Sequence, residues 1–276
     1  HWPDWYYSTM GGLHVVADTN TAIPGGSGNF INFQGHASLD GGTLHFTGVG
    51  GGNQYGIYRG TDGASLQTIV DINTAIPGGN GNFTEFGSVS AETNSVAFIG
   101  YRDFPAQSGN ITDQGVYLAE SGGGLGLVAD LDTAIPDGSG NFTAFGTPSI
   151  DGGNVAFSAR GTSDQYGVYF SDGGLLQEII SLNDTLDGKT LAQLSHGIGL
   201  SGYSVAFWAR FTDGSTGIYR ADGVSAVPEP TALAVFTLGL AALGAARRRG
   251  TKRQRNSHSR YAAGRDRRSA ASYAAS

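Results

Sequence analysis

The sequence predicts an all-β protein made of about four four-stranded repeats. Three observations predict it: a loop sequence that occurs three times, four copies of a Gly-[Ile/Val]-Tyr tripeptide, and a high glycine content. Glycine supplies 46 of the 276 residues, which is more than double its usual share of roughly 7%. Because glycine readily adopts the positive φ angles of tight turns, this content indicates many turns between many short strands.

The repeated loop has the pattern V-A-D-x-[N/D]-T-A-I-P-[G/D]-G-x-G-N-F-x-x-F. Its copies lie at residues 16–33, 70–86 and 128–145, and the second copy lacks one alanine. A strand that begins around the Phe-x-x-Phe pair is expected after each loop. Three further strands are then expected in each unit, each separated from the next by a turn signal such as Gly41-Gly42 or Gly152-Gly153.

These further strands contain, in order, an alternating segment, the Gly-[Ile/Val]-Tyr tripeptide and an aliphatic segment. The alternating segments are 43–46, 95–98, 154–157 and 204–207, the tripeptides are 56–58, 115–117, 167–169 and 217–219, and the aliphatic segments are 66–70, 126–129 and 175–180. A period of about 50 residues with four strands is typical of a propeller blade. A β-sandwich is the main alternative, since regularly spaced short strands also suit it.

Two parts of the array depart from the pattern. In the fourth unit residues 181–188 replace the repeated loop, and no last strand is evident before Val227. At the other end the chain begins partway through a unit, with residues 13–18 expected to complete a strand, so we expect an N-terminal portion to be missing. Each tripeptide tyrosine supplies a large apolar ring with a hydroxyl that can stay in water.

The charge divides the chain into two parts. Residues 1–226 hold 6 Lys+Arg and 21 Asp+Glu, a net charge of −15, whereas residues 227–276 hold 10 and 2, a net charge of +8. We therefore expect a β-repeat domain at 1–226, a separate segment at 227–249 and a disordered basic tail at 250–276. The acidic domain argues against binding to nucleic acid, which requires Lys and Arg to neutralise phosphates. The chain has no cysteine, which excludes disulfides and thiolate chemistry.

The segment at 227–249 has three consecutive features. Val227, Pro228, Glu229 and Pro230 come first, an uncharged apolar run at 231–246 follows, and Arg247, Arg248 and Arg249 end the segment. The run predicts a single hydrophobic helix, slightly shorter than the roughly 20 residues of a usual transmembrane span. The arginine cluster would keep its own end on the cytoplasmic side and leave the acidic domain outside.

This arrangement resembles the PEP-CTERM sorting signal of Gram-negative bacteria. The resemblance implies export by the Sec translocon, recognition and cleavage by an exosortase near Pro228–Pro230, and transient anchoring in the inner membrane. It also implies delivery to the cell surface or the extracellular matrix, with exopolysaccharide as a possible partner. The repeats are similar to those that precede such signals in other bacterial surface proteins. The tail at 250–276 departs from the family, whose signal ends close to the arginines.

The repeated loop offers one candidate metal site. Each copy places two oxygen-bearing side chains two residues apart beside flexible glycines, which suits a hard cation such as Ca²⁺. The candidate ligands are Asp18, Asn20, Asp71, Asn73, Asp130 and Asp132. The alternative is that these side chains bond to their own backbone in Asx-turns. No EF-hand pattern supports the metal hypothesis, and no other cofactor is predicted.

No catalytic constellation is recognisable in the sequence. Neither a His-Glu-x-x-His motif nor a histidine pair at metal-binding spacing is present. Carboxylates are plentiful, so a glycosidase pair, which is defined only in three dimensions, stays an alternative. The sequence favours a non-catalytic structural or binding module sorted by exosortase. The alternatives are a propeller-based hydrolase or lyase that acts on extracellular glycan and a calcium-dependent adhesin.

Overall fold

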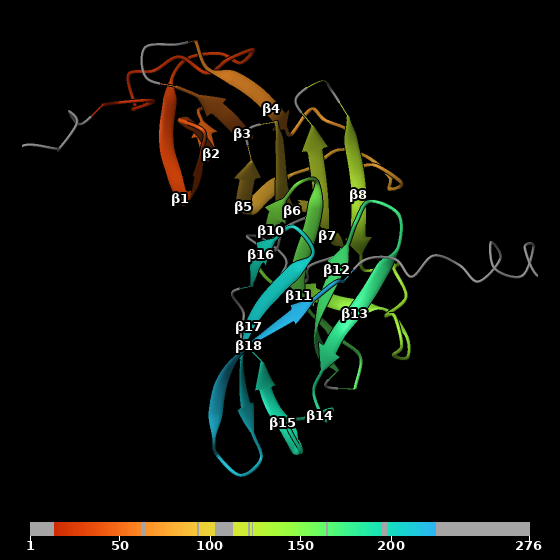
Figure 1. Cartoon of the computed structure of the whole chain (residues 1–276). Helices are drawn as coiled ribbons and strands as arrows, with labels where there is room; N and C mark the ends of the chain where they lie inside the picture. Colours follow the sequence, from red (N-terminus) through yellow and green to blue (C-terminus); the bar gives the residue numbers. More distant parts are fainter. Residues whose placement is uncertain are drawn as a thin grey trace, which may run out of the picture. The chain divides into compact units, whose positions relative to one another are not determined.

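The computed structural model confirms an all-β fold (Figure 1). It describes residues 14–61, 65–92, 94–102, 113–120, 122, 124–163, 165–194 and 198–224. By contacts the chain divides into two compact units, His1–Ser225 and Ala226–Ser276. The described residues all belong to the first unit and contain strands, turns and no helix. The predicted helix at 231–246 and the predicted tail at 250–276 lie outside them.

The first two sheets are antiparallel meanders of four consecutive strands, which we call sheets 1 and 2. Sheet 1 has the order β1 (Phe30–Asp40), β2 (Thr43–Gly50), β3 (Gln54–Gly60) and β4 (Gln67–Asp71). Sheet 2 has the order β5 (Glu85–Glu92), β6 (Ser95–Arg102), β7 (Asp113–Glu120) and β8 (Leu125–Asp130). These strands match the four predicted segments of each unit, so the prediction of four-stranded repeats is confirmed here.

The third sheet follows the same plan with a divided first strand. Sheet 3 comprises β9 (Phe142–Phe145), β10 (Ser149–Asp151), β11 (Asn154–Gly161), β12 (Tyr166–Ser171) and β13 (Leu176–Ser181). Both β9 and β10 pair with β11. Pro148 lies between them, and its missing N–H prevents continuous pairing at that point.

The fourth sheet is the least regular. Sheet 4 comprises β14 (Thr185–Leu186), β15 (Lys189–Leu194), β16 (Gly199–Ser201), β17 (Ser204–Phe211) and β18 (Thr216–Asp222). β15 and β16 form the divided first strand against β17, and β18 pairs with β17 on the other side. Within the described part of the chain no strand pairs with the outer edge of β18, in agreement with the missing last strand expected from the sequence.

Each of the first three sheets has the same aromatic cluster, built from the Phe-x-x-Phe pair, one phenylalanine of the second strand and the tripeptide tyrosine. The first Phe of the pair meets the tyrosine edge to face. The ring centroids are 4.9 Å apart in Phe30–Tyr58, Phe83–Tyr117 and Phe142–Tyr169. Edge-to-face pairs of this kind add about 0.5–1.5 kcal/mol beyond the area they bury. The sequence repeat is therefore a repeat of one packing geometry.

The tyrosine hydroxyls of the first three sheets do not stay in water, because Tyr58, Tyr117 and Tyr169 are only 2%, 1% and 1% exposed. Tyr169 uses its hydroxyl in a hydrogen bond with the Glu178 side chain instead. The predicted strand at 13–18 is absent from its described part, since residues 14–18 form no ladder and Val15 is 70% exposed.

The glycine of each tripeptide is explained by the tyrosine two residues later. A side chain at Gly56 would lie 2.8 Å from the Tyr58 ring, and a side chain at Gly167 would lie 2.8 Å from the Tyr169 hydroxyl. The ring folds back over its own strand, so only glycine leaves room for it.

Consecutive sheets share hydrophobic cores. Ile57 and Val70 of sheet 1 pack with the aromatic cluster of sheet 2. Val116 of sheet 2 packs with the cluster of sheet 3 in the same way, and Val168 of sheet 3 packs with sheet 4. One sheet alone buries too little surface to be stable, so the units stabilise one another through these shared cores.

Candidate functional site

The repeated loop closes on itself through hydrogen bonds. In the first copy Asp18 Oδ1 accepts hydrogen bonds from the Asn20 backbone N–H at 2.9 Å and the Thr21 hydroxyl at 2.8 Å. The Asn20 side-chain amide donates to Asp18 Oδ2 at 3.2 Å. These bonds lower the pKa of Asp18, with the Thr21 hydroxyl as the largest cause. The loop is an Asx-turn in which the carboxylate bonds to its own segment.

The other two copies have the same geometry. Asp71 accepts from the Asn73 N–H at 2.9 Å, and Asp130 accepts from the Asp132 N–H at 3.1 Å. The six candidate calcium ligands thus lie in three separate loops, two in each. Within the described residues no three His, Asp or Glu side chains gather as a metal-binding group. The hydrogen bonds of the loops are those expected for the Asx-turn alternative.

A second set of carboxylates links neighbouring sheets. Glu92, the last residue of β5, accepts hydrogen bonds from the backbone N–H groups of Gly152 and Gly153 at 2.6 and 2.9 Å. Asp151, the last residue of β10, accepts one from the Gly202 N–H at 2.5 Å. In both cases the carboxylate at the end of a first strand binds the following turn of the next sheet. We call this contact the carboxylate latch.

One cross-strand pair of sheet 1 differs from its equivalents in sheets 2 and 3. In sheet 2 Ala97 of β6 lies opposite Leu118 of β7, and in sheet 3 Ala156 lies opposite Phe170. At the same register in sheet 1, His45 of β2 lies opposite Arg59 of β3. A small apolar residue and a large apolar residue are thus replaced by an imidazole and a guanidinium.

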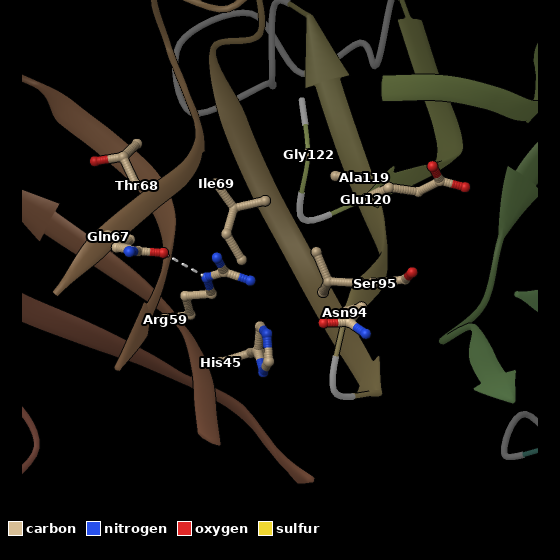
Figure 2. A pocket seen from close by; sticks show the side chains of 11 residues that line it. His45, Arg59, Gln67, Thr68, Ile69, Asn94, Ser95, Ala119, Glu120 and Gly122 are labelled. Carbon is tan, nitrogen blue, oxygen red and sulfur yellow. Dashed lines mark hydrogen bonds between the residues drawn. The ribbon is translucent and has the colours of Figure 1, made fainter. Parts of the chain in front are cut away.

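A cavity of about 340 Å³ lies beside this pair (Figure 2). Sheet 1 contributes His45, Arg59 and three residues of β4. Sheet 2 contributes residues at the turn before β6 and at the turn after β7. The lining residues are His45, Arg59, Gln67, Thr68, Ile69, Asn94, Ser95, Val96, Ala119, Glu120 and Gly122. The wall is therefore polar around His45 and Arg59. Ile69, Val96 and Ala119 form an apolar patch.

The two basic side chains of the cavity, Arg59 and His45, both come from sheet 1. Arg59 donates from Nε to Gln67 Oε1 at 2.8 Å, and Figure 2 shows the guanidinium facing the gap between the two sheets. His45 is 1% exposed, and its Nδ1 has no hydrogen-bond partner within the described structure. Burial lowers the pKa of His45 and the Arg59 cation lowers it further, against smaller raising effects of the Thr43 backbone and the Asp40 carboxylate. The net shift favours the neutral imidazole.

A smaller cavity of about 200 Å³ lies in the third unit and is lined by Asp137, Tyr169 and Glu178 among others. Burial raises the pKa of Glu178, and the nearby Asp184 and Asp137 carboxylates raise it further. Asp137 has a φ of 55°, whereas the equivalent positions in the first two loops are glycines, Gly25 and Gly78. Neither cavity was predicted from the sequence, although both contain residues that depart from the internal repeat.

The fold and the carboxyl-terminal sequence define an all-β repeat protein with a PEP-CTERM sorting signal. The family model described as the PEP-CTERM protein-sorting motif matches residues 226–249, which confirms the resemblance found in the sequence. The chain is thus an exported protein whose precursor is anchored in the membrane at its C-terminus and processed by an exosortase. The signal residues Val227–Pro230 and Arg247–Arg249 lie outside the described residues, and the described residues contain no helix that is long and apolar enough to span a membrane.

The chain belongs to a family of unknown function, DUF7453, whose model matches residues 5–234. No curated protein matches it. A solved structure titled SapL1 lectin in complex with alpha methyl fucoside is similar at a TM-score of 0.34 and 14% identity, covering 70% of this chain and 69% of the lectin. The GH43 endo-arabinanase from Bacillus licheniformis is similar at a TM-score of 0.25 and 13% identity, covering 70% of this chain and 95% of the enzyme.

Proposed function

We propose that this protein is a non-catalytic binding or structural module that an exosortase releases to the cell surface or extracellular matrix, where it contacts exopolysaccharide. The observation that carries the proposal is the sorting signal at 226–249. The latched sheets support it, because an array joined by shared cores and backbone hydrogen bonds presents a continuous surface. The Sec translocon and a transient stay in the inner membrane complete the proposed route.

Fractionation of the native host tests this route. In cells with the exosortase, we expect a chain that lacks its C-terminal segment in the surface or matrix fraction. In cells without the exosortase, we expect the uncleaved chain in the inner membrane. In cells with the exosortase, the variant Glu229→Ala should stay uncleaved in the inner membrane. The control variant Glu120→Ala, which removes an exposed carboxylate of the repeat domain, should be cleaved and sorted normally. An uncleaved wild-type chain in exosortase-positive cells contradicts the proposal.

A second candidate function is hydrolysis of extracellular glycan. The observation that favours it is the cavity of the third unit, where Glu178 has a raised pKa beside other carboxylates. Glycoside hydrolysis uses two carboxyl groups, and the one that acts as general acid has a raised pKa. Release of reducing sugar from host exopolysaccharide tests it. Activity that is lost in Glu178→Gln and kept in Glu120→Gln would support the enzyme, and no release by the wild type would contradict it.

The third candidate function is calcium-dependent adhesion through the repeated loops. Its support is the spacing of the aspartate and asparagine residues in each copy, such as Asp71 and Asn73. Calorimetric titration with Ca²⁺ of a sample treated with EGTA tests it. The hypothesis requires heat of binding and a higher melting temperature, and it fails if neither is observed.

A further inference from the structure

The strongest feature outside the sorting signal is the break in the repeat at His45 and Arg59. An apolar pair can occupy these two positions, because the next two sheets have Ala97 opposite Leu118 and Ala156 opposite Phe170. Burying an imidazole nitrogen without a hydrogen-bond partner lowers the stability of the fold. Such a local loss of stability, placed beside a cavity, is typical of a functional site.

Arg59 supplies the positive charge of the cavity. Its guanidinium makes one hydrogen bond, from Nε to Gln67, and within the described residues it has no ion-pair partner. The Nη groups are therefore available for the two parallel hydrogen bonds that arginine makes to a carboxylate. Glu120 is the acidic residue of the lining, and Figure 2 shows its carboxylate on the opposite side and pointing away from Arg59.

The remaining lining suits a sugar ring. A volume of about 340 Å³ falls at the lower end of ligand cavities, which span about 300–1,000 Å³. Amides of Gln67 and Asn94 provide donors and acceptors for hydroxyl groups, and the apolar patch of Ile69, Val96 and Ala119 can cover the C–H face of a ring. A sugar hydroxyl can donate or accept. It can therefore satisfy Nδ1 of His45 when the imidazole, which lines the cavity but is 1% exposed here, turns toward the ligand.

We propose that this cavity binds an acidic sugar residue of the uronic acid class, with its carboxylate on Arg59 and a neighbouring hydroxyl on His45. This proposal rests on the proposed function as a binding module and names its site and ligand class. The cavity selects for the carboxylate through the Nη groups of Arg59, and it selects for the ring through the amides and the apolar patch.

Calorimetry of the full chain in mild detergent tests the proposal with three probes: sodium glucuronate, glucose and sodium acetate. Glucuronate should bind at least about ten-fold more tightly than glucose or acetate, because only glucuronate has both the carboxylate and the ring. Its affinity should fall as salt is raised. Absence of glucuronate binding, or equal binding of acetate, overturns the proposal.

The repeat itself supplies the variants. Arg59→Leu and His45→Ala install the residues found in sheet 2, so both should fold, and each should weaken glucuronate binding about ten-fold or more. Arg59→Lys keeps the charge, loses the two-pronged geometry and should bind with intermediate affinity. Arg220→Leu is the matched control: Arg220 occupies the equivalent position in sheet 4 and is paired with Asp222 at 2.9 Å, so its loss should leave binding unchanged.

The results separate this proposal from the proposed function. A glycan array probed with the wild type and Arg59→Leu reports binding at any site. Saccharide binding that is equal in the two proteins overturns the cavity assignment and leaves the binding module intact. An array without any bound saccharide, together with the expected release of the chain by exosortase, contradicts both the cavity and the glycan part of the proposed function.

Discussion

Glu92 in sheet 2 accepts a 2.6 Å hydrogen bond from the backbone N–H of Gly152 in sheet 3. A second bond, from Gly153 at 2.9 Å, completes the latch. Hydrogen bonds to a charged group contribute about 1.5–3 kcal/mol. We therefore expect Glu92→Ala to lower the free energy of unfolding by about 2 kcal/mol, measured as a lower urea midpoint. Glu120→Ala, which removes an exposed carboxylate, is the control and should leave the midpoint unchanged. Equal midpoints for the two variants would show that the latch contributes no stability.

The second prediction compares two equivalent aliphatic residues. Val168 of the third tripeptide is completely buried against sheet 4, whereas Ile218 of the fourth is 76% exposed. Val168→Ala should lower the free energy of unfolding by about 2 kcal/mol, because it removes buried methyl groups and leaves a cavity. Ile218→Ala should change it by less than about 0.5 kcal/mol. Chemical denaturation of both variants checks the difference, and a large loss in Ile218→Ala would mean that this face is covered in solution.

The third prediction concerns alkaline pH. Burial raises the pKa of Tyr58 from 10.0 to about 12, with the Asp71 carboxylate adding to the shift. Burial also raises the pKa of Tyr117 and Tyr169. The unfolded chain loses these protons near pH 10 while the folded chain keeps them, so stability is complete below pH 10 and falls between about pH 10 and 12.

Melting temperatures measured from neutral pH upward, together with tyrosinate absorbance, check this behaviour. Tyr58→Phe cannot ionise, so its melting temperature should fall less steeply in the same range. A wild-type chain whose tyrosines titrate near pH 10 without unfolding would contradict the burial of these hydroxyls.

The fourth prediction concerns the repeated loop. Asp71 accepts hydrogen bonds from the Asn73 N–H and the Thr74 hydroxyl at 2.9 and 3.0 Å. Asp71→Ala should cost about 1–2 kcal/mol, since it leaves both donors without this partner. Because the loop satisfies the carboxylate internally, EGTA should not change the melting temperature of the wild type. A clear fall with EGTA that Ca²⁺ reverses would favour the calcium hypothesis instead.

Much of the fold is predictable because the four-stranded unit is repeated several times in the sequence. Repeated segments such as Val155-Ala156-Phe157 and Gly167-Val168-Tyr169 mark strands directly, and the glycines between them mark turns. The burial of the Tyr169 hydroxyl is not predictable from a single unit, because it depends on how consecutive sheets pack. The interruption between β9 and β10 has a local signal, Pro148, that the repeat pattern obscured.

The candidate site was less predictable for a physical reason. His45 stands where the other units have alanine, so the departure is visible once the repeats are aligned. That it lies beside a cavity depends on residues of another sheet, such as Asn94 and Glu120, which no spacing in the sequence connects to it. The latch of Glu92 was hidden for the same reason, because its partner is a backbone group about 60 residues away.

The carboxylate latch also bears on how this chain could evolve. Glu92 and Asp151 each sit at the end of a unit's own first strand and bind backbone N–H groups, which every amino acid except proline provides. A duplicated unit would therefore bring its own connector and would demand no matching side chain from its neighbour. Gene duplication could lengthen or shorten such an array in single steps, while isolated positions such as 45 and 59 diverge to new chemistry.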